Sequence, residues 1–265
     1  MRRASRQRLD EALVERGFAV NRSRAKALIM AGDVLVSGAP VLQAGASVTL
    51  SDAIELKAKP RFVSRGGEKL DHALSVFNID VSNKICADFG ASTGGFADCL
   101  LQRGAVRVYT IDVGYGQLDE RLRHDPRIVN MERTNARYLD SLPEEIGVVV
   151  IDASFISLGL LFPAALRVMR ADGICVPLIK PQFEAGRGDV GKGGVVKANA
   201  IHRRVLAEVI EKATAHGLGL RGLTKSPLKG PAGNIEFLAY LARGAESIDE
   251  GAGIDAVMNE GGAAA

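Results

Sequence analysis

Two acidic residues, with a glycine-rich segment between them, are the first candidates for chemistry. The apolar run 83–89 (NKICADF) carries Asp88 near its end, and residues 90–96 (GASTGGF) follow it. The next apolar run, 106–112 (VRVYTID), ends in Asp112. Because a glycine-rich turn between a strand and a helix presents backbone N–H groups to a ligand, this segment predicts a small-molecule site.

The residues of this turn exclude two classes of nucleotide and favour a cationic ligand. A nucleoside triphosphate loop needs Lys and then Ser or Thr after its last glycine, whereas Phe96 follows Gly95. The glycines also lack the GxGxxG spacing of dinucleotide sites, and Asp88 would repel a pyrophosphate. An acid here instead suits the amino group and sulfonium of S-adenosylmethionine, while Asp112 can accept both hydroxyls of its ribose. The alternative, that the acids cap helices and the glycines only form turns, stays open.

The elements that must hold this turn follow from alternating periodicities. Strands are expected at 83–89, 106–111, 127–131, 147–152, 173–180, 218–226 and 234–242, and helices at 94–103, 116–123, 157–170 and 199–216. Strands separated by helices of this length form a parallel sheet that is covered on both faces, with the ligand at the carboxyl ends of the strands. The predicted fold class is therefore α/β, of the Rossmann-like type.

The first 60 residues differ in charge and in pattern. They hold ten Lys and Arg against six Asp and Glu, while the whole chain holds 34 against 31 with a net charge of +3. All of the net positive charge therefore lies in this segment, as in a module that binds phosphates, although a merely solvated basic face is the alternative. Helices are expected at 7–18 and 23–32, the second capped by Ser23 with Ala27, Leu28 and Ile29 inward, and strands within 33–41 and 46–56.

This segment resembles the S4 RNA-binding domain over about residues 7–57. Its arginines, glycines and apolar residues follow the pattern RLDxxLxxxGxxxxRxxAxxLIxxGxVxVxG, from Arg8 to Gly38. Structured RNA is bound largely through its backbone and shape, which suits a basic helix face. The residues that we expect to contact RNA are Arg6, Arg8, Arg22, Arg24, Lys26 and Arg65.

Six further motifs, in order along the chain, resemble the TlyA family. They are RFVSRGGEKL, ADFGASTGGF, VVVIDASFISL, LIKPQFE, GKGGVVK and KGPAGNIEFL. Members of this family were first named hemolysins and are understood as ribosomal RNA 2′-O-methyltransferases, with an S4 domain before an FtsJ-like methyltransferase domain. The resemblance implies S-adenosylmethionine as methyl donor, a cytidine 2′-hydroxyl as acceptor, and ribosomal RNA or a ribosomal subunit as partner, with neither a metal nor a membrane.

The resemblance also implies a catalytic tetrad of Lys69, Asp152, Lys180 and Glu236. Lys180 is expected to act as the base or to stabilise the oxyanion, with Asp152 orienting it, while Lys69 and Glu236 position the ribose. The residues expected at the cofactor are Asp88, Gly90, Ala91, Ser92, Gly94, Gly95, Phe96, Asp112, Val113, Asn135 and Asp152.

These patterns predict an S4-like domain at 1–60, a methyltransferase domain at 61–244 and an acidic, disordered tail at 245–265. Three scattered cysteines and the lack of a long apolar run or secretory signal favour a cytoplasmic protein with reduced thiols. Three alternatives remain at this point: a catalytically silent ribosome-assembly factor that binds RNA, a membrane-active hemolysin, and a methyltransferase of small molecules.

Overall fold

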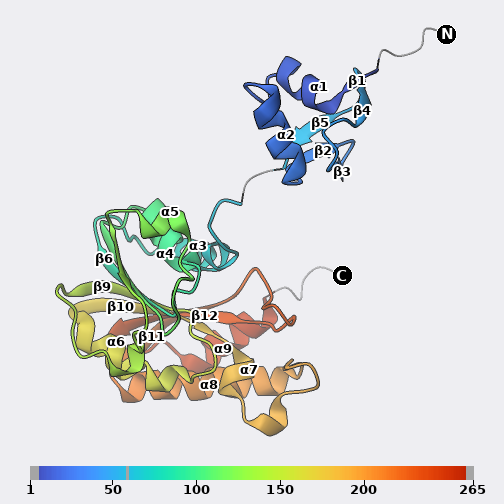
Figure 1. Ribbon diagram of the computed structural model, residues 1–265. Helices are drawn as coiled ribbons and strands as arrows, with labels where there is room; N and C mark the ends of the chain where they lie inside the picture. The colour runs from blue at the N-terminus through green and yellow to red at the C-terminus, as the bar shows by residue number, and fades with distance from the viewer. Residues whose placement is uncertain (1–5, 58–59, 261–265) are drawn as a thin grey trace. The chain divides into compact units, whose positions relative to one another are not determined.

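The chain forms two compact units, residues 1–60 and 61–265 (Figure 1). The computed structural model describes residues 6–57 and 60–260. The first unit mixes short helices with short strands, and the second is an α/β unit with one large sheet. Both results confirm the fold class that the sequence predicts.

The smaller unit packs two helices against short antiparallel strands. Its elements are β1 (Arg6–Arg8), α1 (Leu9–Glu15), α2 (Arg22–Met30), β2 (Val34–Val36), β3 (Ala39–Pro40), β4 (Ser47–Thr49) and β5 (Ile54–Leu56). Strand β1 pairs with β4, and β2 pairs with both β3 and β5. Leu9, Leu13 and Ile29 of the two helices are fully buried against Val34 and Val48, and this cluster is the unit's own core.

Two details of α2 differ from expectation. Asn21, and not Ser23, caps the helix, because its side-chain oxygen accepts a hydrogen bond of 2.9 Å from the backbone N–H of Arg24. Ala25 is buried while Ala27 is exposed. Ala25 lies three positions before the next buried residue of α2, as one face of an α-helix requires.

The larger unit is built on a sheet of seven strands. They are β6 (Ile85–Phe89), β7 (Arg107–Ile111), β8 (Ile128–Met131), β9 (Ile146–Ile151), β10 (Met169–Ile179), β11 (Leu218–Lys225) and β12 (Phe237–Arg243). Their order across the sheet is β11-β12-β10-β9-β6-β7-β8. The five strands from β10 to β8 are parallel, and β12 is antiparallel to both of its neighbours. The sheet is therefore mixed, which corrects the expectation of a purely parallel sheet.

Helices cover both faces of this sheet (Figure 1). They are α3 (Gly66–Val76), α4 (Gly95–Gln102), α5 (Glu120–Arg123), α6 (Phe162–Val168), α7 (Pro181–Glu184), α8 (Asn199–Ala215) and α9 (Glu250–Asn259), with 3-10 turns η1 (Ala136–Tyr138), η2 (Leu158–Leu160) and η3 (Arg187–Asp189). Alternate residues of β9 show why both faces are covered. Val148 and Val150 pack in one hydrophobic cluster with α3 and α4, whereas Val149 and Ile151 pack in another with α6 and α8.

The reversed direction of β12 brings two distant segments to the same edge. Ile179, the last residue of β10, pairs with Phe237, the first residue of β12. The residues just outside these strands, Lys180 and Glu236, therefore lie at the edge where the parallel strands end. Glu236 precedes β12 and is not inside a strand, which corrects the expected strand 234–242.

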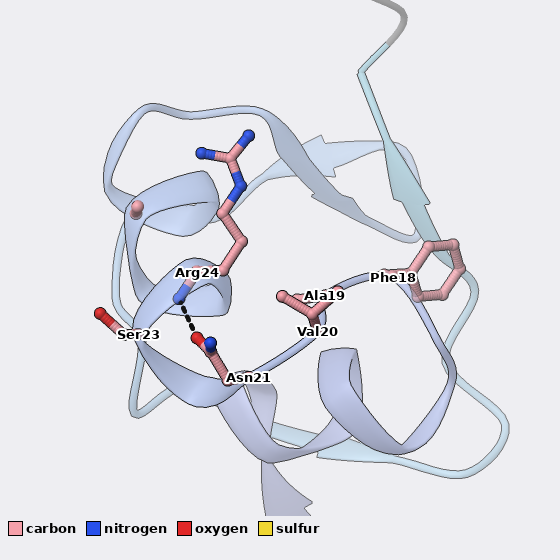
Figure 2. A pocket seen from close by; sticks show the side chains of 7 residues that line it. Phe18, Ala19, Val20, Asn21, Ser23 and Arg24 are labelled. Carbon is pink, nitrogen blue, oxygen red and sulfur yellow. Dashed lines mark hydrogen bonds between the residues drawn. The ribbon is translucent and has the colours of Figure 1, made fainter.

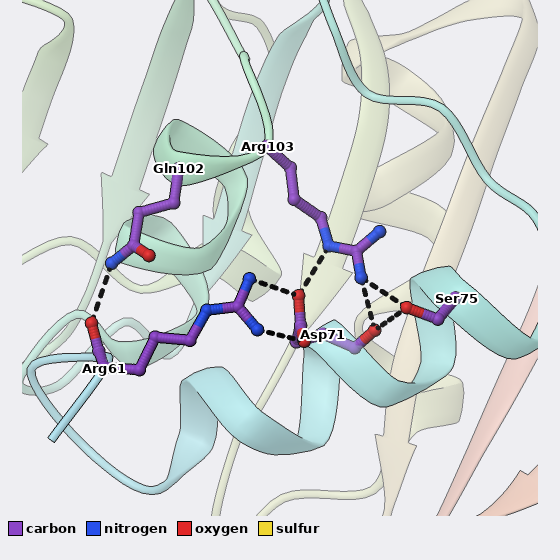
Figure 3. A network of polar contacts seen from close by, with 5 residues as sticks. All are labelled: Arg61, Asp71, Ser75, Gln102 and Arg103. Atoms are coloured by element: carbon purple, nitrogen blue, oxygen red, sulfur yellow. Dashed lines mark hydrogen bonds and ion pairs between the residues drawn. The ribbon is translucent and has the colours of Figure 1, made fainter.

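A polar network fixes α3 against α4 (Figure 3). The Asp71 carboxylate of α3 accepts hydrogen bonds from Arg61, at 2.6 and 3.2 Å, and from Arg103 Nε at 2.7 Å. Burial opposes the charge on Asp71, but the bonds from Arg103 and Arg61 outweigh it and lower the pKa of this carboxyl. Gln102 at the end of α4 donates to the Arg61 carbonyl at 2.9 Å. The network holds Lys69, two residues before Asp71, in register with the turn that begins α4.

A disordered tail was expected at 245–265, but most of this C-terminal segment is ordered. Residues 250–259 form α9, and Asp249 caps it by accepting a hydrogen bond of 2.9 Å from the backbone N–H of Ala252. Ile254 and Val257 are buried in the larger hydrophobic cluster, because their spacing of three places both on one helix face. Residues 261–265 of the predicted tail lie outside the described residues.

We predict that α9 stabilises the larger unit. Replacing Ile254 with Ala removes buried methyl groups and leaves a cavity, so Ile254→Ala should lower the free energy of unfolding by about 2–5 kcal/mol. The exposed Asn259→Ala on the same helix is the matched control, with an expected change within about 0.5 kcal/mol. Urea unfolding of the full chain measures both. Equal stability of the two variants would mean that α9 does not pack as described.

Candidate active site

Charged side chains gather at the carboxyl edge of the parallel strands. Asp88 lies near the end of β6, Asp112 follows β7, Asp152 follows β9, and Lys180 follows β10. Glu236 reaches the same edge from the start of β12. In open α/β sheets this edge is where ligands bind, so the topology alone marks it as the candidate site.

The four residues of the expected tetrad form two ion pairs. Lys69 Nζ lies 2.5 Å from Glu236 Oε2, and both side chains are buried. Lys180 Nζ lies 2.7 Å from Asp152 Oδ1, with the lysine side chain 10% exposed and the aspartate 26% exposed. Burial raises the pKa of Asp152, while Lys180 and then Lys69 lower it, so charges of both pairs act on this one carboxyl. The structure therefore brings all four residues together.

The turn after β6 adopts the backbone that its glycines permit. Gly90 and Gly94 have φ values of +85° and +92°, which residues with a side chain rarely adopt. A Cβ at Gly90 would lie 3.0 Å from the Asp152 carbonyl oxygen, so this glycine lets two strand ends approach each other. The turn is also tied to the next strand, because Asp112 Oδ2 accepts a hydrogen bond of 2.8 Å from Ser92 N. The second oxygen of Asp112 accepts one of 2.7 Å from Gly114 N.

Asp88 is a buried carboxyl with one unused oxygen. Its Oδ2 accepts a hydrogen bond of 3.0 Å from Ala97 N, at the start of α4, whereas no described residue bonds to its buried Oδ1. Burial raises the pKa of Asp88 well above its usual range, and the charges of Asp152 and Asp112 add to this effect. A cation next to Oδ1 would supply the missing partner and stabilise the charged form.

Two adjoining pockets open along this edge. One, of about 310 Å³, is lined by Asp88, Lys69, Arg65 and the glycine-rich turn. The other, of about 550 Å³, is lined by Asp112 and a mostly apolar wall that includes Ile111. Both pockets share Gly90, Ser92 and Asp152.

The structure places the other expected cofactor residues around these pockets. Ala91, Gly95 and Phe96 line the smaller pocket, while Val113 and Asn135 line the larger one. Gly94 is not in either lining, because its backbone faces Leu118 and Leu122 on the other side of the turn. Several lining residues were missed from the sequence, among them Ser64, Thr134, Ser154 and Phe155. Ser154 and Phe155 stand just after Asp152 in DASFISL, and this nearness was the only signal for them.

The expected RNA-contacting arginines of the smaller unit divide into two groups. Arg8 Nε and Arg22 both bond to the fully buried carboxylate of Asp10, each at 3.0 Å. Hydrogen bonds from Arg8 and, against the effect of burial, from Arg22 lower the pKa of Asp10 to about 2. Arg8 and Arg22 are therefore structural as well as basic, because removing either leaves a buried charge with fewer partners.

Arg24 and Lys26 form the second group. Both are exposed, and within residues 6–57 and 60–260 neither side chain has an ion-pair or hydrogen-bond partner. Arg24 borders a shallow pocket of about 540 Å³ with Val20 and Asn21 (Figure 2). Arg6 is also exposed on β1, whereas Arg65 belongs to the larger unit and donates a hydrogen bond of 2.8 Å to the Lys229 carbonyl.

The part of the chain that the structure describes lacks two features, a membrane-spanning helix and a metal-binding cluster. It contains no helix with the length and apolar character needed to cross a membrane. It also contains no group of three or more His, Cys, Asp or Glu placed to hold a metal ion. The three cysteines, Cys86, Cys99 and Cys175, are buried and unpaired, and burial raises the pKa of each thiol, for Cys86 and Cys99 to about 12.

Known proteins match this chain over both units. The model of the FtsJ-like methyltransferase family matches residues 62–243, and the model of the S4 domain matches residues 7–54. The chain is 46% identical over 244 residues to the 16S/23S rRNA (cytidine-2′-O)-methyltransferase TlyA of Mycobacterium tuberculosis, with 90% of each chain covered. It is 43% identical over 240 residues to Hemolysin A of Brachyspira hyodysenteriae, covering 88% of this chain and 99% of the relative.

A solved structure agrees with these matches. The structure titled "Putative hemolysin from Streptococcus thermophilus" has a TM-score of 0.75 and 40% identity, and covers 97% of this chain and 96% of its own. The identity with relatives is high over nearly the whole chain, and both domain models match in the order expected. The chain therefore belongs to the TlyA family, in which an S4 domain precedes an FtsJ-like methyltransferase domain.

Proposed function

We propose that this protein transfers a methyl group from S-adenosylmethionine to the 2′-hydroxyl of a cytidine in ribosomal RNA, in the cytoplasm. The observation that carries the proposal is the Lys180–Asp152 ion pair, because Asp152 lines both pockets at the edge of the sheet. A lysine held there can act on a ribose hydroxyl brought next to a cofactor in those pockets. The family and the named activity of the Mycobacterium tuberculosis relative support the same chemistry.

The residues of the two pockets fit S-adenosylmethionine. The unpartnered Oδ1 of Asp88 suits the cofactor's amino group, and the carboxylate of Asp112, at the rim of the larger pocket, suits its ribose hydroxyls. The apolar wall of the larger pocket, which includes Ile111 and Leu161, suits an adenine ring. When bound, the cofactor supplies an electrophilic methyl group on a sulfonium.

Lys180 and Asp152 form the part of the site that acts on the ribose hydroxyl. A ribose 2′-hydroxyl is a weak acid, and negative charge develops on its oxygen as it reacts. Lys180 Nζ lies 2.7 Å from Asp152 Oδ1 in an ion pair, and it donates hydrogen bonds to Ser154 Oγ and to the Asp152 carbonyl oxygen. We therefore assign Lys180 to stabilising the 2′-oxygen through a donated hydrogen bond, with Asp152 holding the ammonium in place. As the 2′-oxygen bonds to the methyl carbon, the carbon–sulfur bond breaks and the hydroxyl proton passes to solvent water.

The Lys69–Glu236 pair forms the second wall of the site. Glu236 Oε1 also accepts a hydrogen bond of 3.3 Å from Gln182 Nε2, so this carboxylate ties α3 to α7. Both pairs together carry no net charge, which leaves the site electrically balanced before the cationic cofactor enters. We assign Lys69 and Glu236 to positioning the ribose.

The smaller unit is assigned to docking the ribosomal RNA. Arg24 and Lys26 at the start of α2 have no side-chain partner among the described residues, and they suit phosphate contacts that depend little on sequence. The S4 domain match over residues 7–54 covers this face.

The first prediction from this proposed function concerns Asp88 and the cofactor. In Asp88→Asn the cofactor's amino group loses a charged partner, so S-adenosylmethionine should bind at least about 10-fold more weakly by calorimetry. Folding raises the pKa of Asp88, so the wild type should lose stability relative to Asp88→Asn as pH rises from 5 to 8. Urea unfolding of the cofactor-free protein at both pH values checks this sign.

Asp80→Asn is the control for both measurements, because Asp80 is exposed and bonds only to Ser82 among the described residues. Unchanged cofactor affinity in Asp88→Asn would show that the amino group binds elsewhere.

The second prediction concerns Lys180. Lys180→Met keeps the length of the side chain but removes its donor, so methyl transfer to ribosomal RNA should fall by roughly 10²- to 10³-fold. The affinities for S-adenosylmethionine and for RNA should change little, because the interaction strengthens only in the transition state. Transfer of a labelled methyl group to RNA measures the rate, with the exposed Lys192→Met as control. Retention of most of the wild-type rate would rule out this assignment.

The third prediction separates docking from folding in the smaller unit. Each phosphate contact contributes roughly −0.7 to −0.9 to the slope of log affinity against log salt. Replacing Arg24 and Lys26 together with Ala should make that slope shallower by about 1.4 to 1.8 and leave the melting temperature unchanged. Arg22→Ala should instead lower the melting temperature, because Asp10 loses a partner. Parallel salt series for wild type and double variant would refute the phosphate contacts.

A further inference from the structure

Ser154 lies directly against the assigned catalytic lysine. Lys180 Nζ donates a hydrogen bond of 2.9 Å to Ser154 Oγ. The other acceptors near this nitrogen are Asp152 Oδ1 at 2.7 Å and the Asp152 carbonyl oxygen at 3.3 Å. An ammonium group has three N–H donors, and Ser154 Oγ and the Asp152 carbonyl oxygen accept from two of them, whereas Asp152 Oδ1 is an ion-pair contact without hydrogen-bond geometry. Ser154 Oγ is therefore the one oxygen of the three that does not belong to Asp152.

The segment that carries Ser154 is anchored at two places. Lys180 holds Ser154 itself, and three residues further on Glu184 of α7 accepts hydrogen bonds from Ser157 Oγ at 2.8 Å and Leu158 N at 2.7 Å. The Glu184 side chain is only 3% exposed. Because Glu184 and Lys180 both belong to the segment after β10, that segment fixes the position of Ser154 relative to the lysine.

Ser154 is nevertheless accessible to a substrate. Its side chain is exposed and lines the larger pocket, as does Phe155. Phe155 is held at φ +64° and its ring lies 4.8 Å from that of Phe183. No described residue other than Lys180 bonds to the Ser154 hydroxyl, so its bond to the lysine is its one fixed interaction.

We propose that Ser154 is a positioning residue for methyl transfer, which orients the Lys180 ammonium by accepting a hydrogen bond from one of its N–H groups until the ribose 2′-oxygen accepts a hydrogen bond from that N–H. This inference rests on the proposed function. Ser154 is expected to affect kcat, because it acts through Lys180. It is not expected to affect the binding of the cofactor.

Few charged or aromatic groups surround Lys180 among the described residues. Asp152 contacts it directly, and Lys69 and Glu236 act on the same cluster through their effects on Asp152. The Phe183 ring lies with its centroid 5.8 Å from Nζ. Removing the Ser154 hydroxyl leaves all of these groups in place, so its effect can be measured alone.

The kinetic test compares Ser154→Ala with Ser154→Thr, which keeps a hydroxyl on the same carbon. In Ser154→Ala, kcat should fall roughly 10- to 100-fold while KM for RNA and the Kd for S-adenosylmethionine change less than about 2-fold. Ser154→Thr should recover most of kcat, and Ser141→Ala, at an exposed position before β9, should match wild type.

Two kinetic results would overturn the inference. One is an unchanged kcat in Ser154→Ala. The other is a rise in KM with kcat intact, which would assign Ser154 to direct substrate binding.

A measurement without RNA or cofactor separates this inference from the proposed function. The ¹H–¹⁵N signal of the Lys180 ammonium, identified by its loss in Lys180→Met, should be visible in the wild type and broadened by solvent exchange in Ser154→Ala. An identical signal in both proteins would refute the positioning role even if the enzyme is active. A wild type that transfers no methyl group to ribosomal RNA would refute the proposed function, while the lysine signal would still report on Ser154.

Discussion

Two ion pairs at one edge of the sheet, Lys69 with Glu236 and Lys180 with Asp152, constrain the rest of the larger unit. Removing a charged group from water costs several kcal/mol even after relaxation, so each buried ammonium requires a carboxylate at contact distance. The four side chains come from α3, from the residues just after β9 and β10, and from the segment before β12, which are far apart along the chain. The fold must therefore bring four elements to one place to within hydrogen-bond distance.

The antiparallel strand β12 is the element that makes this possible. A sixth parallel strand at this position would begin at the opposite edge of the sheet, and the residue before it would lie far from the catalytic edge. Because β12 runs the other way, Glu236 meets Lys69 beside the end of β10. The network around Asp71 then fixes α3, so that Lys69 faces Glu236. The glycine-rich turn completes the site, since Gly90 allows the ends of β6 and β9 to approach closely.

Much of this arrangement can be predicted from the sequence, for a simple reason. Apolar runs that end in a charged residue mark both the strands and the edge at which they end, and this placed Asp88, Asp112, Asp152 and Lys180 correctly at strand ends. The features that were missed depend on contacts between distant segments. The reversal of β12, the bond from Lys180 to Ser154 and the pairing of Arg22 with Asp10 leave no local pattern.

Composition misled in two places. The acidic, glycine-containing segment after residue 245 suggested disorder, but two apolar residues three positions apart are enough to pack α9 on the core. No helix was predicted over 66–76, where α3 begins with two glycines that resemble a turn. Gly67 is needed there because a Cβ would lie 2.3 Å from the Phe62 ring. In both places the helix is set by packing and not by intrinsic propensity.

The most direct test of the account is mass-spectrometric mapping of ribose methylation in ribosomal RNA. Ribosomal subunits from cells that lack this protein would be incubated with S-adenosylmethionine and either the wild type or Lys180→Met. The account predicts a new methyl group on the 2′-oxygen of a cytidine with the wild type, and none with the variant. A methyl group on a base, or none with the wild type, would contradict the account.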